Sequence, residues 1–127
     1  MEAFILENLN YSPSYQNNLS NHLSMSILAL FHLGANESQL SEFNSFYISK
    51  LEKINQFDEI NVLKQQYLQR INDNQEEIEA IINELIPYIT SAGFHAIIRT
   101  SYILSELKQQ FLPSNTITQE LALSLAY

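Results

Sequence analysis

The sequence predicts an all-α protein, a single compact bundle of about five to six helices over residues 1–127. Apolar residues recur at three- and four-residue spacing through most of the chain, and no stretch shows the alternation of a strand over a useful length. Two glycines and three prolines interrupt the chain. Hydrophobic residues make up 46% of 127 residues, which is enough for the core of one domain and too little chain for two.

The chain begins with an irregular segment, because residues 1–16 contain Pro13 and show no sustained period. We expect these residues to form an arm. From Asn17 or Asn18 onward, apolar residues fall on one stripe and predict a helix that ends at Gly34. A glycine directly after the last periodic residue is a common left-handed helix cap.

Asn36 starts the next predicted helix, since asparagine is a good N-cap and Gln39 can complete a capping box. This helix is predicted to run to about Ile54. A further helix is predicted within residues 58–72, and another runs over residues 76–86 with Pro87 near its end.

Two helices are predicted in the last third of the chain. The first follows Gly93 and ends before Pro113, and Ser114 or Asn115 caps the second. Residues 121–127 are apolar on more than one face of that final helix. They either pack into the core of the same chain or form an interface with a second chain, as in a homodimer.

Charge and composition exclude several classes of function. The net charge is −8, and the six Lys and Arg residues are scattered singly, so we expect no nucleic-acid partner. Cysteine is absent, which excludes disulfides and thiolate metal sites. Neither a signal peptide nor a run long enough to span a bilayer is visible, so we expect a cytoplasmic protein without membrane contact.

Two short segments each place a histidine in an apolar helical run beside a residue that can form hydrogen bonds. In the first, Asn21 and His22 are followed by Met25 and, after an aliphatic run, by residues 33–35 (LGA). In the second, residues 93–99 (GFHAIIR) contain His95 and are followed by Tyr102. These segments resemble the N-terminal part of the questin oxidase-like family, whose members are usually several times longer.

The resemblance implies an oxidoreductase of the monooxygenase or oxygenase type, acting on an aromatic, polyketide-like small molecule. It implies metal ligands at His22 and His95, and a catalytic group of His95, Arg99 and Tyr102. The implied cofactors are non-haem iron and NADPH. His32 lies in a less distinctive stretch and is expected to be structural. The later histidine-bearing segments of full-length members are not in this chain.

Each of these residues also has a simpler interpretation. A lone histidine on an apolar helix is commonly a core residue bonded to one partner. Arg99 can form a buried salt bridge with Glu84, Glu106 or a helix C-terminus, and Tyr102 can be a core residue with a tethered hydroxyl.

Two imidazoles are fewer ligands than oxygen-activating iron commonly uses, which is about three. A two-fold dimer would supply four, from His22 and His95 of each chain. A ligand pocket is expected to be lined by aromatic residues, namely Phe31, Phe43, Phe46, Phe94 and Tyr102.

The sequence leaves two functions open. One is a small oxidoreductase that works as a dimer or with a second chain. The other is a non-catalytic helical module for binding or assembly, a shortened homologue of the enzymes it resembles. A third reading is that a neighbouring gene encodes the missing segments.

Overall fold

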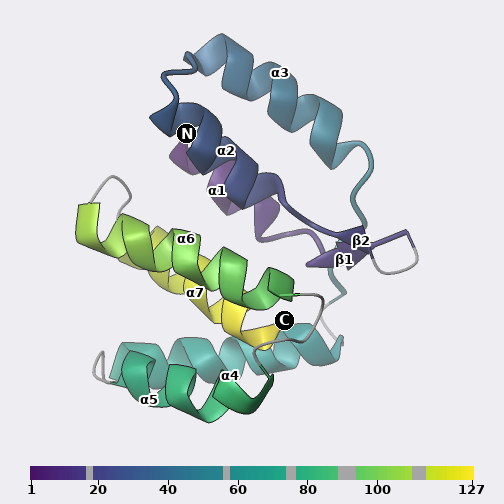
Figure 1. Ribbon diagram of the computed structural model, residues 1–127. Helices are drawn as coiled ribbons and strands as arrows, with labels where there is room; N and C mark the ends of the chain where they lie inside the picture. Colours follow the sequence, from purple (N-terminus) through teal and green to yellow (C-terminus); the bar gives the residue numbers. More distant parts are fainter. Residues whose placement is uncertain (17–18, 56–57, 74–76, 89–93, 110–113) are drawn as a thin grey trace. The chain divides into compact units, whose positions relative to one another are not determined.

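The computed structural model confirms the all-α class (Figure 1). It describes residues 1–127 except 17–18, 56–57, 74–76, 89–93 and 110–113. Seven α-helices and one two-stranded ribbon lie in the described part of the chain. The chain divides into two compact units, Met1–Ile54 and Asn55–Tyr127, and each unit is described by itself. The single domain expected from the sequence stays a prediction.

The first unit contains three helices and the ribbon. Helix α2 packs against both α1 and α3. The apolar core of this unit consists mainly of Ile5, Leu23, Ile27, Leu28 and Leu40, which are almost completely buried. In chain order the elements are α1 (Glu2–Asn8), β1 (Ser14–Tyr15), β2 (Leu19–Ser20), α2 (Leu23–His32) and α3 (Glu37–Ile48).

The junction between α2 and α3 follows the sequence prediction closely. Gly34 has a φ of +89°, and its N–H donates to Phe31 O while that of Ala35 donates to Leu30 O. This pair of bonds is a Schellman motif, which needs a residue that tolerates positive φ. Two residues later, the side chains of Asn36 and Gln39 each accept a hydrogen bond from the other's backbone N–H, which confirms the predicted capping box.

The start of the chain differs from the prediction. The irregular arm over residues 1–16 is wrong for Glu2–Asn8, which form α1. A helix of seven residues is too short to be stable by itself, so tertiary contacts must hold it, and Ile5 is fully buried. A segment of seven residues is too short to show a clear helical period in its apolar residues, so the sequence pattern did not predict this helix.

The boundaries of the next two helices also differ. Helix α2 begins at Leu23 rather than at Asn17 or Asn18, because β2 pairs antiparallel with β1 just before it. Helix α3 ends at Ile48 rather than near Ile54. The residues after it return along the start of the chain: Ser12 N–H donates to Glu52 O, and Ile54 N–H donates to Asn10 O. This pairing replaces the last predicted helical turn.

The second unit contains the helices predicted for the rest of the chain. Helix α7 packs against α4 and α6, and α5 packs against α4 (Figure 1). The described core of this unit consists mainly of Ile71, Ile81, Ile103, Ile117 and Leu121. Its elements are α4 (Glu59–Asp73), α5 (Glu77–Leu85), the 3₁₀-helix η1 (Ile86–Tyr88), α6 (His95–Gln109) and α7 (Ser114–Ala126). Pro113, predicted to stop the preceding helix, lies outside the described residues.

The apolar C-terminal helix is buried within the chain. Residues 120–126 of α7 are all buried, and the helix packs against α4 and α6. Of the two readings of this segment, packing within the same chain therefore accounts for its apolar character.

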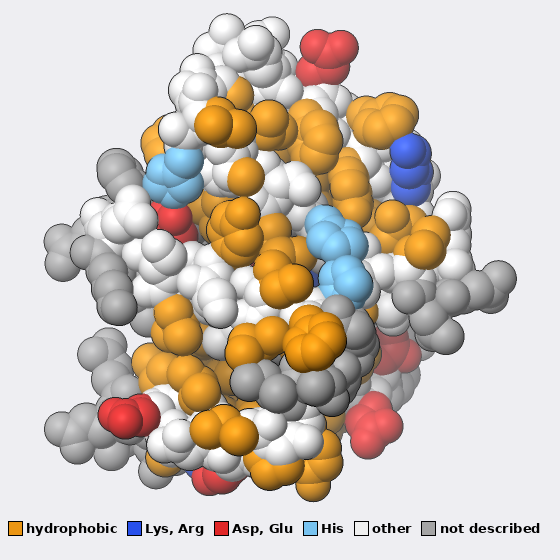
Figure 2. Space-filling model, viewed as in Figure 1, with side chains coloured by type: hydrophobic (Ala, Val, Ile, Leu, Met, Phe, Trp, Pro, Cys, Tyr) orange, Lys and Arg blue, Asp and Glu red, His pale blue; other side chains and the backbone are white. Residues whose placement is uncertain are grey.

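Apolar side chains also reach the surface. On the face drawn in Figure 2 they are widespread, with acidic side chains scattered among them. Helix α6 carries Phe94 just before its start and Ile98 and Tyr102 within it, all three exposed. No helix in the described ranges combines the length and the apolarity needed to cross a membrane.

Candidate ligand pocket and buried polar clusters

A pocket of about 240 Å³ lies within the second unit. Its wall is built from α4, α5, η1, α6 and α7, so that every described element of the unit contributes. Ile86 and Tyr88 of η1 are 52% and 66% exposed, and they mark a side at which the pocket meets solvent. The lining residues are Leu63, Tyr67, Ile82, Leu85, Ile86, Tyr88, Ala96, Ile97, Thr100, Ser124, Leu125, Ala126 and Tyr127.

The lining is mostly aliphatic and carries no charged side chain. The polar residues in the lining carry hydroxyl groups, and they are Thr100, Ser124 and three tyrosines. Thr100 and Ser124 are buried, whereas Tyr88 is exposed. An apolar wall with a few hydroxyls is the usual composition of a site for a neutral organic molecule.

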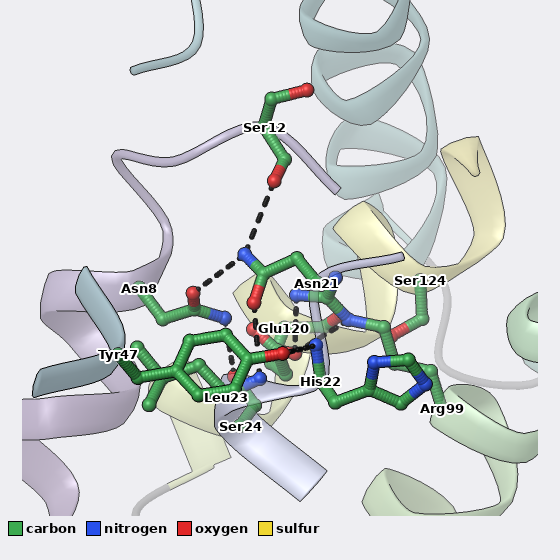
Figure 3. Close-up of polar contacts among 10 residues, drawn as sticks. All are labelled: Asn8, Ser12, Asn21, His22, Leu23, Ser24, Tyr47, Arg99, Glu120 and Ser124. Atoms are coloured by element: carbon green, nitrogen blue, oxygen red, sulfur yellow. Dashed lines mark hydrogen bonds and ion pairs between the residues drawn. The ribbon is translucent and has the colours of Figure 1, made fainter. Parts of the chain in front are cut away.

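A buried ion pair joins α6 to α7 close to this pocket. Arg99 Nε donates to Glu120 Oε1 at 2.8 Å, and Arg99 Nη2 lies 2.7 Å from the same oxygen (Figure 3). The two side chains are only 2% and 0% exposed. Thr100, the next residue after Arg99, lines the pocket, and so does Ser124, one turn after Glu120.

The charges in this cluster are not all matched by hydrogen bonds. Arg99 Nη1 and Glu120 Oε2 are buried and have no hydrogen-bond partner among the described residues. Lys64 of α4 is also buried. Burial lowers the pKa of Lys64 below its usual value, the nearby Glu120 carboxylate opposes this shift, and the Arg99 guanidinium adds to it. One carboxylate thus interacts with two cations.

The sequence predicted the kind of interaction at Arg99 but not the partner. A buried salt bridge is present, yet its acid is Glu120 rather than Glu84 or Glu106. Glu84 instead forms a two-bond ion pair with Arg70 at 2.9 and 3.0 Å, in which both side chains are partly exposed. The signal for Glu120 was available, because it is the one charged residue in the apolar run of residues 117–127.

In the first unit, Asn21 is the centre of a buried polar network (Figure 3). Asn21 Nδ2 donates to Asn8 Oδ1 at 2.9 Å and to Ser12 O at 3.1 Å, while its Oδ1 accepts from Leu23 N–H at 3.0 Å. Asn8 Nδ2 in turn donates to Ser24 Oγ at 2.6 Å. Asn21 therefore ties α1 to α2 and starts α2, which is a structural role.

His22 is the N-cap residue of α2 and is half-buried. Its backbone N–H donates to the hydroxyl of Tyr47 at 3.1 Å. Burial raises the pKa of Tyr47 to about 12; the bond from His22 acts in the opposite direction, and Tyr15 raises it further.

The predicted catalytic residues lie on one helix of the second unit. His95, half-buried, is the first residue of α6, with Arg99 four and Tyr102 seven residues later. The Arg99 guanidinium is occupied by Glu120, and Tyr102 is 39% exposed. His22 belongs to the first unit, so the convergence of His22 and His95 stays a prediction.

The described residues contain no group of three or more His, Asp or Glu side chains that could hold a metal ion. The ligand set for oxygen-activating iron commonly has about three protein groups. The side chain of His32, which was expected to be structural, is exposed. Its ring packs edge-to-face against the ring of Phe31, with 5.5 Å between the ring centroids.

The residues expected to line a pocket do not line this one. Phe46 and Phe94 are 60% and 53% exposed, and Phe31 and Phe43 are half-buried in the first unit. The actual wall is mostly aliphatic because many of its residues lie on the apolar stripes of α4, α5, α6 and α7. Periodicity identifies such stripes but does not show where their packing leaves a space.

The described residues form a small helical protein with one largely apolar pocket in the second unit. Comparisons with protein-family models, with curated proteins and with solved structures gave no match to the chain.

We predict that Asn21→Ala lowers the free energy of unfolding by about 2–3 kcal/mol. The substitution removes the hydrogen-bond partner of Asn8 Oδ1, of Ser12 O and of the Leu23 N–H. Urea denaturation measures this loss. Asn10→Ala is the matched control, since the Asn10 side chain makes one exposed bond to Glu7 O, and it should cost less than about 0.5 kcal/mol. Equal costs for the two variants would contradict the structural role of Asn21.

We predict that Arg99→Met and Glu120→Gln each destabilise the protein by about 3–5 kcal/mol, because each substitution leaves the other member of the buried ion pair without its opposite charge. The double variant should lose less than the sum of the two single losses. Denaturant unfolding at pH 7 tests this, with Arg70→Met and Glu84→Gln as a matched exposed pair whose loss should cost much less, because solvent screens it. Similar losses at the two pairs would argue against a dry environment at Glu120.

Proposed function

We propose that this protein is a helical binding module whose second unit takes up a small, neutral, largely apolar molecule. The pocket of about 240 Å³ carries the proposal. An engineered apolar cavity of about 150 Å³ already holds benzene, and pockets for larger ligands begin near about 300 Å³. The size therefore suits a molecule of one or two rings.

The composition of the wall supports a ligand rather than water as the occupant. Water in contact with an apolar wall is weakly held, and replacing it with an apolar group of a ligand is favourable. Thr100 and Ser124 are the buried hydroxyl-bearing residues of a mostly aliphatic lining. The absence of charged side chains from this lining disfavours an ionic ligand, whose desolvation would not be compensated.

We predict that titration with benzene, benzofuran or indole shifts backbone amide signals of the lining residues in ¹H–¹⁵N NMR spectra. A dissociation constant on the order of 0.1 mM is expected for a ligand of about nine heavy atoms. Ala96→Phe should abolish binding by filling the pocket. Ala80→Phe is the matched control, because Ala80 is exposed on α5 and does not line the pocket. If no ligand of this series shifts the lining amides, the proposal fails.

A second candidate function is oxidation of a bound aromatic molecule, as the questin oxidase-like resemblance implied. One observation favours it. His95 directly precedes Ala96, and the same helix lines the pocket with Ile97 and Thr100. A titratable imidazole thus stands at the start of a pocket helix. A homodimer or a second chain would have to supply the further metal ligands, in the way that the sequence suggested for His22 and His95.

Metal analysis of the purified protein tests this second candidate. If it is right, the wild-type protein binds iron, and His95→Ala loses the metal while it keeps its melting temperature and its affinity for benzofuran. His32→Ala is the control, because His32 is exposed on α2 and is expected to retain the metal. Protein free of iron, or iron that is unaffected by His95→Ala, would leave binding as the function.

A further inference from the structure

One face of helix α6 presents large apolar side chains to solvent. Ile98 and Tyr102 lie one turn apart on this face and are 45% and 39% exposed. Phe94, just before the first residue of α6, is 53% exposed. None of these three residues lines the pocket. A surface helix usually turns polar residues toward solvent, so an apolar face of this kind indicates a surface that binds a partner.

The backbone of Phe94 gives a second observation. Its φ is +70°, in the left-handed region that a bulky residue adopts only at a cost in free energy. Good packing of the side chain normally offsets such a cost, yet just over half of Phe94 is exposed. Packing within the chain therefore does not account for this conformation, whereas burial of the ring under a partner would.

The polar residues of the same helix do not oppose burial of this face. Among the described side chains of α6, the exposed ones carry no charge. Ser101 Oγ donates to Ile97 O at 2.7 Å, and Gln109 Nε2 donates to Ser105 Oγ at 3.1 Å. Because these groups already form hydrogen bonds within the helix, a partner can cover them at a small cost in lost hydration.

The charge of the second unit decides which kind of partner fits. The charged side chains that are exposed in the described part of this unit are all acidic, namely Asp58, Glu59, Glu79 and Glu84. Of its cations, Lys64 and Arg99 are buried, and Arg70 is paired with Glu84. The whole chain has a net charge of −8, so a second copy would bring charge of the same sign. A partner with lysine and arginine beside its apolar residues is attracted instead.

We propose that the face formed by Phe94, Ile98 and Tyr102 is a docking surface for a basic amphipathic helix of a partner protein. The apolar stripe of that helix contacts these three side chains, and its basic residues interact with the acidic surface of the second unit. Amphipathic helices commonly bind apolar surfaces in this way. The inference goes beyond the proposed uptake of a small molecule, because it uses residues outside the pocket wall.

A synthetic helical peptide tests the proposal. The peptide has about 18 residues, with leucine at three- and four-residue spacing and lysine at the other positions. Fluorescence anisotropy should show that it binds the full chain. Binding should weaken about three- to tenfold when the salt concentration rises from about 0.05 M to about 0.3 M, because salt screens the attraction between charges. A peptide with glutamate in place of lysine should bind at least about tenfold more weakly.

A pair of matched variants locates the binding surface. Ile98→Asp should weaken binding of the lysine peptide at least about tenfold, because it places a carboxylate against apolar residues of the peptide. Val62→Asp is the control: Val62 is 47% exposed on α4 of the same unit, and the substitution adds the same charge. It should change the affinity by less than about twofold. If Ile98→Asp does not fold, as judged by circular dichroism, Tyr102→Asp replaces it.

The outcomes distinguish this proposal from its alternatives. Lack of binding by the lysine peptide, equal binding of the two peptides, or equal losses in Ile98→Asp and Val62→Asp would each overturn it. A wild-type dimer that Ile98→Asp dissociates in sedimentation velocity would also overturn it, because a second copy would then be the occupant. The pocket is tested separately. Benzofuran should bind Ile98→Asp as tightly as the wild-type protein, and its failure to bind either one would overturn the proposed function and leave this surface in place.

Discussion

The carboxylate of Glu120 is the constraint on which the second unit depends. It is completely buried, so its charge must be balanced inside the protein, and the guanidinium of Arg99 does this. Since the two residues belong to α7 and α6, the need to keep them together fixes these helices against each other. The same contact fixes the neighbouring Thr100 and Ser124, and with them one side of the pocket. A charged pair that is costly to bury thus positions an uncharged site.

The first unit uses neutral hydrogen bonds for the same purpose. Asn21 joins α1, the following loop and the start of α2 through its amide, and Asn44 of α3 donates to Glu7 of α1 at 2.8 Å. The apolar core of this unit is small, so directional bonds between side chains must specify how its short helices pack. In the N-terminal motif, the asparagine therefore has a structural explanation that does not require a metal at the adjacent His22.

The two units differ in what they offer for chemistry. In the first, the polar side chains of the Asn21 network bond to one another or to the backbone, which describes a scaffold. In the second, helices that meet around α7 leave a space lined mainly by aliphatic residues and by several hydroxyl-bearing residues. The largely apolar character of this wall is what the proposed binding function depends on.

The sequence by itself determined the all-α class, the capping box at Asn36, the turn at Gly34 and the existence of the helices from α4 to α7, because periodicity and capping are local properties. Tertiary structure decided the rest. It formed α1, whose seven residues need Ile5 and Asn8 to be held by α2, and it paired Arg99 with Glu120, 21 residues away. It also left a pocket among aliphatic stripes that the sequence could identify only as core. The way in which helices pack decides which distant residues become partners and where a space remains between side chains. A local sequence pattern does not contain this information.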